Sequence, residues 1–181
     1  MGQPGPRHVI LLGFMGSGKT TVGRLIAERM GLPFVDTDRC VEELAGMTIP
    51  EIFDRAGEET FRSYETRALR HALAGPPSII ATGGGIVTRE ENWPLMTSRG
   101  VTVWLRVGFD TLRRRLADSK DRPLLSGDTT WERTRRLYLQ REPLYRRAAA
   151  WVDGEQPAEV VADTVIKAVG SLPDARNDRV E

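Results

Sequence analysis

Residues 8–20 read HVILLGFMGSGKT, a short apolar run followed by a glycine-rich turn that ends in lysine and threonine. Residues 13–20 match the pattern GxxxxGK[ST], and TVGRLIAERM at 21–30 has the periodicity of an amphipathic helix. A strand, a glycine-rich loop and a helix in this order form a P-loop, in which backbone N–H groups and the helix N-terminus hold phosphate. The stretch therefore predicts nucleotide binding, with a glycine-rich turn that binds nothing as the alternative.

Two side chains of this loop suit a nucleoside triphosphate. Lys19 would place its ammonium between the β- and γ-phosphates, and the hydroxyl of Thr20 would bind Mg²⁺. The chain otherwise uses arginine far more than lysine, since its only lysines are Lys19, Lys120 and Lys167. A compact ammonium at this position fits a point contact with phosphate.

The rest of the chain alternates short apolar runs with helical patterns, which is typical of an α/β fold with a mostly parallel sheet covered on both faces. The predicted strands are residues 8–12, 34–35, 79–81, 101–106 and 151–152. Polar or Gly/Pro-rich ends predict flexible tails at 1–7 and 171–181 around a single unit at 8–170.

Local signals also predict where helices begin and end. Three pairs have capping-box spacing: Thr48 with Glu51, Thr88 with Glu91 and Thr129 with Glu132. Three glycines are expected to end helices in the left-handed conformation: Gly31, Gly75 and Gly100.

Composition excludes several classes of protein. With 181 residues, a net charge of +1 and 40% hydrophobic residues, the chain resembles a soluble globular protein, and nucleic acid is not an expected partner. No run of about 18 apolar residues predicts a membrane span. Its single cysteine, Cys40, cannot form an internal disulfide and lacks metal-ligand spacing, so a reducing cytoplasmic location is expected.

Asp36 and Asp38 follow the second predicted strand, at the edge of an α/β sheet where ligands bind. Residues two apart on an extended chain point the same way, so both carboxylates could face a cleft beside the P-loop. One could hold Mg²⁺ and the other could accept a hydrogen bond from an attacking hydroxyl. Alternatively, Asp38 could only cap the following helix.

Three adjacent glycines, Gly83, Gly84 and Gly85, follow the third predicted strand at the same edge. They would let backbone approach a ligand closely, with a flexible turn as the alternative. Four arginines are further candidates for anion binding, although most arginines are solvated surface charges. They are Arg62, Arg115, Arg122 and Arg141.

Six segments together resemble the shikimate kinase family in order and approximate spacing, across residues 8–170: GFMGSGKT (13–20), VDTD (35–38), FRSYE (61–65), ATGGG (81–85), DRPLL (121–125) and REPLYR (141–146). The P-loop alone indicates an NTPase, whereas the other five segments are markers of the family. The resemblance implies a three-layer P-loop fold with a five-stranded parallel sheet in the order 2-3-1-4-5, flanked by helices.

On the nucleotide side, the resemblance implies that ATP is the phosphate donor and that Thr20 and Asp36 arrange Mg²⁺. Residues 116–128 resemble a mobile lid whose Arg122 would close over the phosphates, and Lys19, Asp38 and Arg122 would be the catalytic residues. ATP would contact Gly16, Ser17, Gly18, Lys19, Thr20, Thr21, Arg115, Arg122, Gln156 and Pro157. Arg115 would stack on adenine, whereas Gln156 stands where some relatives carry arginine.

On the acceptor side, the resemblance implies a shikimate site in residues 37–65 and the glycine cluster. Asp38 would orient the 3-hydroxyl, and Arg62 and Arg141 would bind the carboxylate, with Glu65 orienting Arg62. The implied contacts are Asp38, Phe53, Phe61, Arg62, Gly83, Gly84, Gly85 and Arg141. Phe53 and Phe61 would flank the ring, or would simply belong to the core.

The expected partners are therefore small molecules, ATP and shikimate, and the protein is expected to be a monomer that binds neither nucleic acid nor membranes. Two alternatives stay open. The acceptor could be gluconate or a nucleoside monophosphate on the same fold, or the chain could be a non-catalytic regulator in which ATP only switches conformation. The chain lacks an NKxD motif, which disfavours guanine nucleotides.

Overall fold

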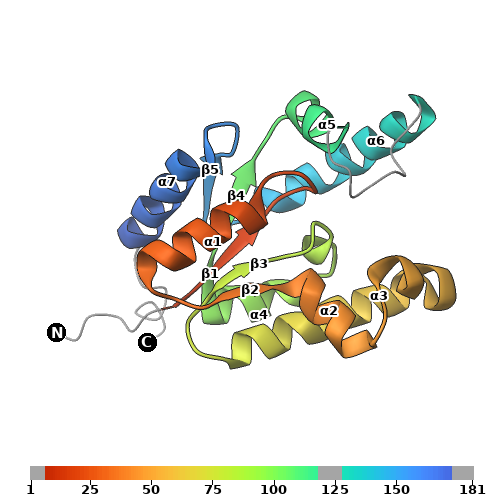
Figure 1. Cartoon of the computed structure of the whole chain (residues 1–181), viewed down its shortest axis with the longest axis horizontal. Coiled ribbons are helices and arrows are strands. Elements are labelled where there is room, and N and C mark those ends of the chain that lie inside the picture. The colour runs from red at the N-terminus through yellow and green to blue at the C-terminus, as the bar shows by residue number, and fades with distance from the viewer. Residues whose placement is uncertain (1–6, 118–127, 173–181) are drawn as a thin grey trace, which may run out of the picture.

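A computed structural model describes residues 7–117 and 128–172 of the chain, with the side chains of 128–130 excluded. The strands in these ranges are β1 (His8–Leu12), β2 (Phe34–Asp36), β3 (Ile79–Ala81), β4 (Gly100–Arg106) and β5 (Ala150–Asp153). They form one parallel sheet in the order β2-β3-β1-β4-β5 (Figure 1). The predicted fold class and strand order are confirmed.

Helices cover both faces of this sheet (Figure 1). The helices of the described residues are α1 (Lys19–Met30), α2 (Thr37–Ala45), α3 (Ile49–Ala74), the short 3-10 helix η1 (Ile86–Thr88), α4 (Asn92–Arg99), α5 (Phe109–Ala117), α6 (Asp128–Tyr145) and α7 (Ala158–Ser171). Core residues of α1 and α7 share one face with the sheet, while those of α3, α4 and α6 pack on the other. None of these helices is long and apolar enough to cross a membrane, as far as the described residues go.

The central strand β1 shows how the sequence produces these layers. Successive side chains of a strand point to opposite faces of the sheet. Val9 and Leu11 accordingly join the core beneath α1 and α7, whereas Ile10 and Leu12 join the core beneath α3, α4 and α6. All four are at most 1% exposed, and full burial of such a side chain contributes about 1.5–3 kcal/mol. The apolar run before the P-loop therefore fixes the P-loop to the middle of the sheet.

Helix α3 begins with the predicted capping box. The backbone N–H of Thr48 donates to Glu51 Oε2 at 2.8 Å, and Thr48 Oγ1 accepts from the Glu51 N–H at 3.4 Å. The helix is interrupted at Gly57, where φ is 80° and ψ is 174°, values outside the helical region. The segment before Gly57 therefore changes direction relative to the long segment that carries Arg62 and Glu65.

Several predicted boundaries are wrong. Thr88 does not cap a helix, because its hydroxyl donates to the Gly85 carbonyl at 2.7 Å and α4 begins only at Asn92. Thr129 lies inside α6, which begins at Asp128. Gly31 does end α1 in the left-handed conformation, at φ 63°, as predicted. The two remaining glycines end their helices in extended conformation instead: Gly75 and Gly100.

Some predictions fall outside the described residues. These are the N-terminal tail at 1–6, most of the lid with Arg122 at 118–127, and the C-terminal tail at 173–181. At the C-terminal boundary, α7 continues to Ser171, one residue beyond the predicted unit.

Candidate active site

The P-loop lies between the carboxyl end of β1 and the N-terminus of α1. Gly16 and Gly18 have φ of 80° and 92°, in the region that side-chain-bearing residues rarely adopt. Gly18 is also the N-cap of α1. Because glycine has no side chain, it cannot accept a hydrogen bond from the first N–H groups of the helix. The helix thus begins with backbone N–H groups directed at the loop, an arrangement that attracts phosphate.

Lys19 folds back over this loop. Its ammonium donates to the carbonyls of Gly13 and Phe14 at 2.8 and 3.0 Å, and to Ser17 Oγ at 3.3 Å. The ammonium is therefore held above the turn in which phosphate groups would sit, and a phosphate oxygen could replace one of these acceptors.

Thr20 and Asp36, the two predicted Mg²⁺ ligands, lie together. Thr20 Oγ1 donates to Asp36 Oδ2 at 3.1 Å, and Asp36 Oδ1 accepts from the Asp38 N–H at 3.1 Å as the N-cap of α2. A hydroxyl and a carboxylate supply the hard oxygen atoms that Mg²⁺ prefers, and Mg²⁺ keeps most of its water. The Thr20 hydroxyl and the Asp36 carboxylate are therefore suitable ligands for Mg²⁺. No group of three or more His, Cys, Asp or Glu side chains that could hold a metal occurs within residues 7–117 and 131–172.

A cavity of about 250 Å³ opens beside the P-loop. Arg115 spans it, donating to the Gly16 carbonyl at 3.4 Å and to the Gly154 carbonyl at 3.0 Å. The other lining residues include Ser17, Gly18, Thr21 and Gln156. This cavity gathers most of the residues predicted to contact ATP, whereas Pro157 is the N-cap of α7 and does not line it.

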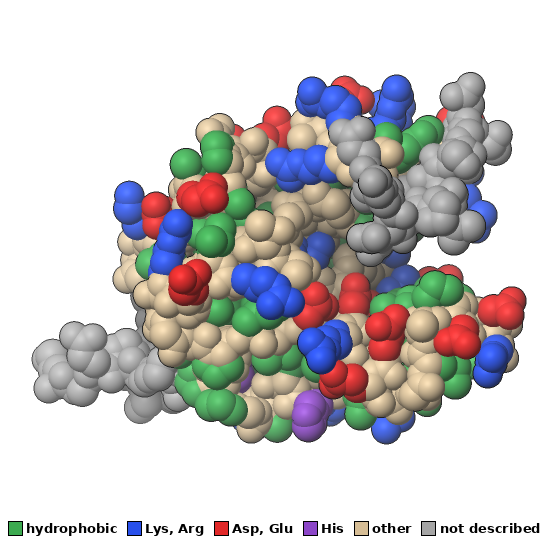
Figure 2. All heavy atoms as spheres, viewed as in Figure 1, with side chains coloured by type: hydrophobic (Ala, Val, Ile, Leu, Met, Phe, Trp, Pro, Cys, Tyr) green, Lys and Arg blue, Asp and Glu red, His purple; other side chains and the backbone are tan. Residues whose placement is uncertain are grey.

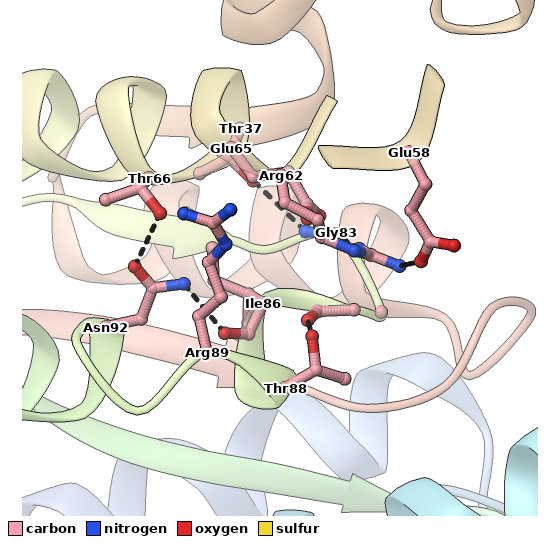
Figure 3. A network of polar contacts seen from close by, with 12 residues as sticks. Thr37, Glu58, Arg62, Glu65, Thr66, Gly83, Ile86, Thr88, Arg89 and Asn92 are labelled. Carbon is pink, nitrogen blue, oxygen red and sulfur yellow. Dashed lines mark hydrogen bonds and ion pairs between the residues drawn. The ribbon is translucent and has the colours of Figure 1, made fainter. Parts of the chain in front are cut away.

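The glycine cluster after β3 packs against the start of α2. The Gly83 N–H donates to Thr37 Oγ1 at 3.1 Å (Figure 3). A Cβ added at Gly83 would lie 2.6 Å from Asp38 Oδ1 and 2.7 Å from Glu65 Oε1, so a side chain there would displace both carboxylates. The two carboxylates therefore approach the cluster from α2 and α3. The alternative that Asp38 only caps α2 is wrong, because Asp36 is the N-cap and Asp38 lies in the first turn of the helix.

Arg62 and Glu65 form a buried ion pair on α3. Arg62 Nη1 donates to Glu65 Oε2 at 2.5 Å, and Nη2 donates to Glu58 Oε1 at 3.0 Å (Figure 3). Arg62 is 9% exposed and Glu65 is 2% exposed. Burial raises the pKa of the Glu65 carboxyl, while Arg62 opposes the rise. The pair fixes the guanidinium of Arg62 beside the glycine cluster.

Arg141 approaches the same place from α6. It is 8% exposed, and its Nε has no hydrogen-bond partner among the described residues. Burial lowers the pKa of Arg141, and the positive charge of Arg62 contributes to the lowering. A buried, incompletely bonded guanidinium next to a second one favours an anionic ligand.

The remaining predicted acceptor residues take different positions. Phe61 is buried in the core of α2 and α3 with Val41 and Ile52, whereas Phe53 is exposed and its ring centroid lies 4.6 Å from that of Phe61. Figure 2 shows a hollow between the α6 side and the α2–α3 side of this face, with acidic and basic side chains along its rim.

Two residues of this site are not among those predicted from the sequence. Thr37 accepts the hydrogen bond from Gly83, and the Tyr145 hydroxyl donates to the Gly84 carbonyl. Tyr145 is four residues beyond Arg141, and this helical spacing was the one local signal that could have revealed it.

Comparison with known proteins gives consistent results. A family model described as shikimate kinase matches residues 15–170. The chain is 42% identical over 170 residues to the shikimate kinase of Ruegeria pomeroyi, covering 93% of this chain and 87% of the relative. It is 46% identical over 165 residues to that of Symbiobacterium thermophilum, with 88% and 95% covered. Among solved structures, the shikimate kinase from Acinetobacter baumannii in complex with shikimate superposes with a TM-score of 0.85 at 34% identity, covering 97% of this chain and 96% of the other.

Proposed function

The chain belongs to the shikimate kinase family, and we propose that it transfers the γ-phosphate of ATP to the 3-hydroxyl of shikimate, giving shikimate 3-phosphate and ADP. One observation of the structure carries the proposal. Arg62 and Arg141, from different helices, are both more than nine-tenths buried beside the glycine cluster at the sheet edge that holds the P-loop. Two buried guanidinium groups in that position suit an acceptor that bears a carboxylate.

On the donor side, the P-loop N–H groups would bind the β-phosphate of ATP, and adenine would enter the cavity spanned by Arg115. Lys19 would exchange a loop carbonyl for phosphate oxygens and neutralise part of their charge. Thr20 and Asp36 would hold Mg²⁺, which supplies further positive charge to the phosphates when bound. The transfer itself needs alignment and charge neutralisation more than covalent help from the protein.

On the acceptor side, Arg62 and Arg141 would bind the carboxylate, which leaves the ring hydroxyls directed at Asp38. Asp38 would accept a hydrogen bond from the 3-hydroxyl and so aim that oxygen at the γ-phosphorus. Arg122, which lies outside the described residues, is proposed from the resemblance to add positive charge over the phosphates. ATP and shikimate are the proposed partners, and a cytoplasmic monomer is the proposed form.

The rival acceptors fit less well. A nucleoside monophosphate could present its phosphate to the two arginines, but the family model that matches residues 15–170 is that of shikimate kinase. Gluconate does carry a carboxylate, but the chain belongs to the shikimate kinase family along residues 15–170. A regulator that only senses ATP would have no use for the buried pair of Arg62 and Glu65.

An acceptor screen tests the proposal. The purified protein is incubated with MgATP and with shikimate, gluconate, AMP or no acceptor, and ADP release is measured. Only shikimate should stimulate release, and the product should carry phosphate on the 3-hydroxyl. Stimulation by gluconate or AMP alone would assign another acceptor, and no stimulation by any of them would favour the regulator.

Calorimetric titration then separates the two ligand sites. Arg62→Ala and Arg141→Ala should each weaken shikimate binding about tenfold or more, because a charge-assisted hydrogen bond contributes about 1.5–3 kcal/mol. ATP binding should be unchanged in both. Arg39→Ala is the matched control, since the side chain of Arg39 on α2 is 78% exposed and pairs only with Glu43 among the described contacts.

A further inference from the structure

Tyr145, at the end of α6, connects two parts of the acceptor site. Its hydroxyl donates a hydrogen bond to the Gly84 carbonyl at 2.5 Å. The residue is 1% exposed, and its ring stacks on Trp104 with centroids 6.0 Å apart and an angle of 21° between the planes. The ring is thus held by the core, while the hydroxyl reaches the glycine cluster.

The hydrogen bonds of this phenol have a definite direction. A phenol has one proton, and here that proton is given to the Gly84 carbonyl. The oxygen can therefore only accept from a further partner, and the positive charge of Arg141, one helical turn earlier on α6, acts on it. Burial raises the pKa of Tyr145 far above its ordinary value, so the phenol keeps its proton. The phenol consequently gives its proton to Gly84 and leaves its oxygen as an acceptor near the charge of Arg141.

The bond to Gly84 also controls a neighbouring donor. A peptide unit is planar and trans, so its C=O and N–H groups point in opposite directions. Fixing the Gly84 carbonyl toward Tyr145 therefore fixes the Gly85 N–H away from Tyr145. One phenol oxygen thus sets the orientation of the peptide between Gly84 and Gly85 and lies next to the charge of Arg141.

We propose that Tyr145 is a positioning residue for the acceptor's carboxylate, holding Arg141 and the Gly84–Gly85 peptide in the relation that the bound carboxylate requires. The inference rests on the proposed function, because it assumes that Arg141 binds this group. Tyr145 acts through its two neighbours and before the substrate arrives. A guanidinium that is already held loses less freedom on binding, so the effect falls on substrate affinity and not on phosphoryl transfer.

Tyr138 provides a matched control on the same helix. It is also a buried tyrosine, 9% exposed, and its hydroxyl donates to the Val107 carbonyl at 3.2 Å. Among the described residues, its hydroxyl makes no hydrogen bond to Arg141 or to the glycine cluster. Removing either hydroxyl therefore deletes one buried hydrogen bond to a backbone carbonyl. Only removal of the Tyr145 hydroxyl should change the acceptor site.

The test compares Tyr145→Phe with Tyr138→Phe in the full chain. Melting temperature, kcat and the KM values for shikimate and ATP are measured for both. Both variants should lose similar thermal stability. Tyr145→Phe alone should raise the KM for shikimate by about tenfold, the scale of one hydrogen bond to a charged group, with kcat and the KM for ATP unchanged.

A double-mutant cycle with Arg141→Ala gives a second measurement. If Tyr145 acts through Arg141, adding Tyr145→Phe to Arg141→Ala should change the dissociation constant for shikimate by much less than tenfold. Equal KM values for shikimate in Tyr145→Phe and Tyr138→Phe, or additive effects in the cycle, would overturn the inference. Failure of the wild-type protein to phosphorylate shikimate would instead overturn the proposed function, so the two failures are distinguishable.

Discussion

The guanidinium of Arg62 occupies the space in which a side chain at Gly85 would have to lie. A Cβ built at Gly85 would overlap Nη1 of Arg62, and Nη2 would be only 2.8 Å away. The backbone of Gly85, with φ −96° and ψ −3°, does not itself require glycine. The missing side chain therefore makes room for Arg62, and the guanidinium requires glycine here more than the turn does.

Gly85→Ala should consequently weaken shikimate binding while leaving the fold intact. Alanine adopts the observed backbone conformation without strain, but its methyl group must displace the end of the Arg62 side chain. We expect the dissociation constant for shikimate to rise about tenfold or more, as for loss of a charged hydrogen bond, and the melting temperature to fall, because the displaced guanidinium weakens its buried pair with Glu65. Calorimetry and thermal denaturation measure the two effects.

Gly170→Ala is the control for this substitution. Gly170 lies in α7, and a Cβ there would meet no atom within 4 Å. Alanine in a helix is better than glycine by roughly 0.5–1 kcal/mol, so this variant should be slightly more stable and fully active. Unchanged shikimate affinity in Gly85→Ala would show that Arg62 does not bind the acceptor from its observed position.

Asp38→Asn should give a folded protein that binds ATP but is nearly inactive. The asparagine keeps the size of the side chain beside Gly83 and loses only the charge and the acceptor strength of the carboxylate. Turnover should fall by about 10²–10⁴, the range attributed to a positioned general acid or base. Steady-state kinetics measure turnover, and full activity in a folded Asp38→Asn protein would remove this carboxylate from the mechanism.

Glu65 should make shikimate binding sensitive to acid. Burial raises the pKa of its carboxyl above the ordinary value of 4.5, and Arg62 only partly opposes this. The folded state therefore favours the protonated form, so the contribution of Glu65 to the free energy of unfolding is greatest below the ordinary pKa and is lost as pH rises through the raised pKa. Shikimate binding should depend on pH in the opposite direction, because only the carboxylate form of Glu65 holds Arg62 in place. The dissociation constant for shikimate should increase as pH falls through the raised pKa.

Glu65→Gln tests this assignment. The amide cannot titrate, so this variant should bind shikimate more weakly at neutral pH and should lose the acid-dependent part of the wild-type profile. Titrations of both proteins across the acidic range provide the comparison. An identical acid limb in wild type and Glu65→Gln would assign the titration to another group.

Arg115→Ala should affect ATP alone. Its guanidinium closes one side of the cavity next to Gly16 and Gly154, away from the glycine cluster after β3. Loss of a cation–π contact with adenine costs about 0.5–2 kcal/mol, so the KM for ATP should rise from a few-fold to roughly thirtyfold. The KM for shikimate should not move, and an effect on that constant would show that the cavity is not the adenine site.

Much of the architecture follows from local signals in the sequence. The apolar runs mark each strand to within one residue at either end, and the P-loop motif sits between a buried strand and a helix as expected. The capping box at Thr48 and Glu51 could be predicted because both partners are three residues apart and exposed. The same spacing failed at Thr88, where the turn after the glycine cluster offers the hydroxyl a nearer acceptor in Gly85.

Contacts between distant segments could not be predicted in this way. Tyr145 and Gly84 are 61 residues apart, and the pairing exists only because α6 packs against η1, which follows the glycine cluster. The glycine cluster could be assigned to the sheet edge from its position after a strand. The fit of Gly83 between Asp38 and Glu65 depends on how α2 and α3 pack, which no local pattern encodes.

The most direct test of the account compares shikimate with its methyl ester, which keeps the ring and hydroxyls but loses the carboxylate charge. Calorimetric titration of the wild-type protein should show the ester binding about tenfold to a hundredfold more weakly, and Arg141→Ala should largely abolish that difference. If the wild-type protein binds the ester as tightly as shikimate, then Arg62 and Arg141 do not recognise a carboxylate and the proposed acceptor site is wrong.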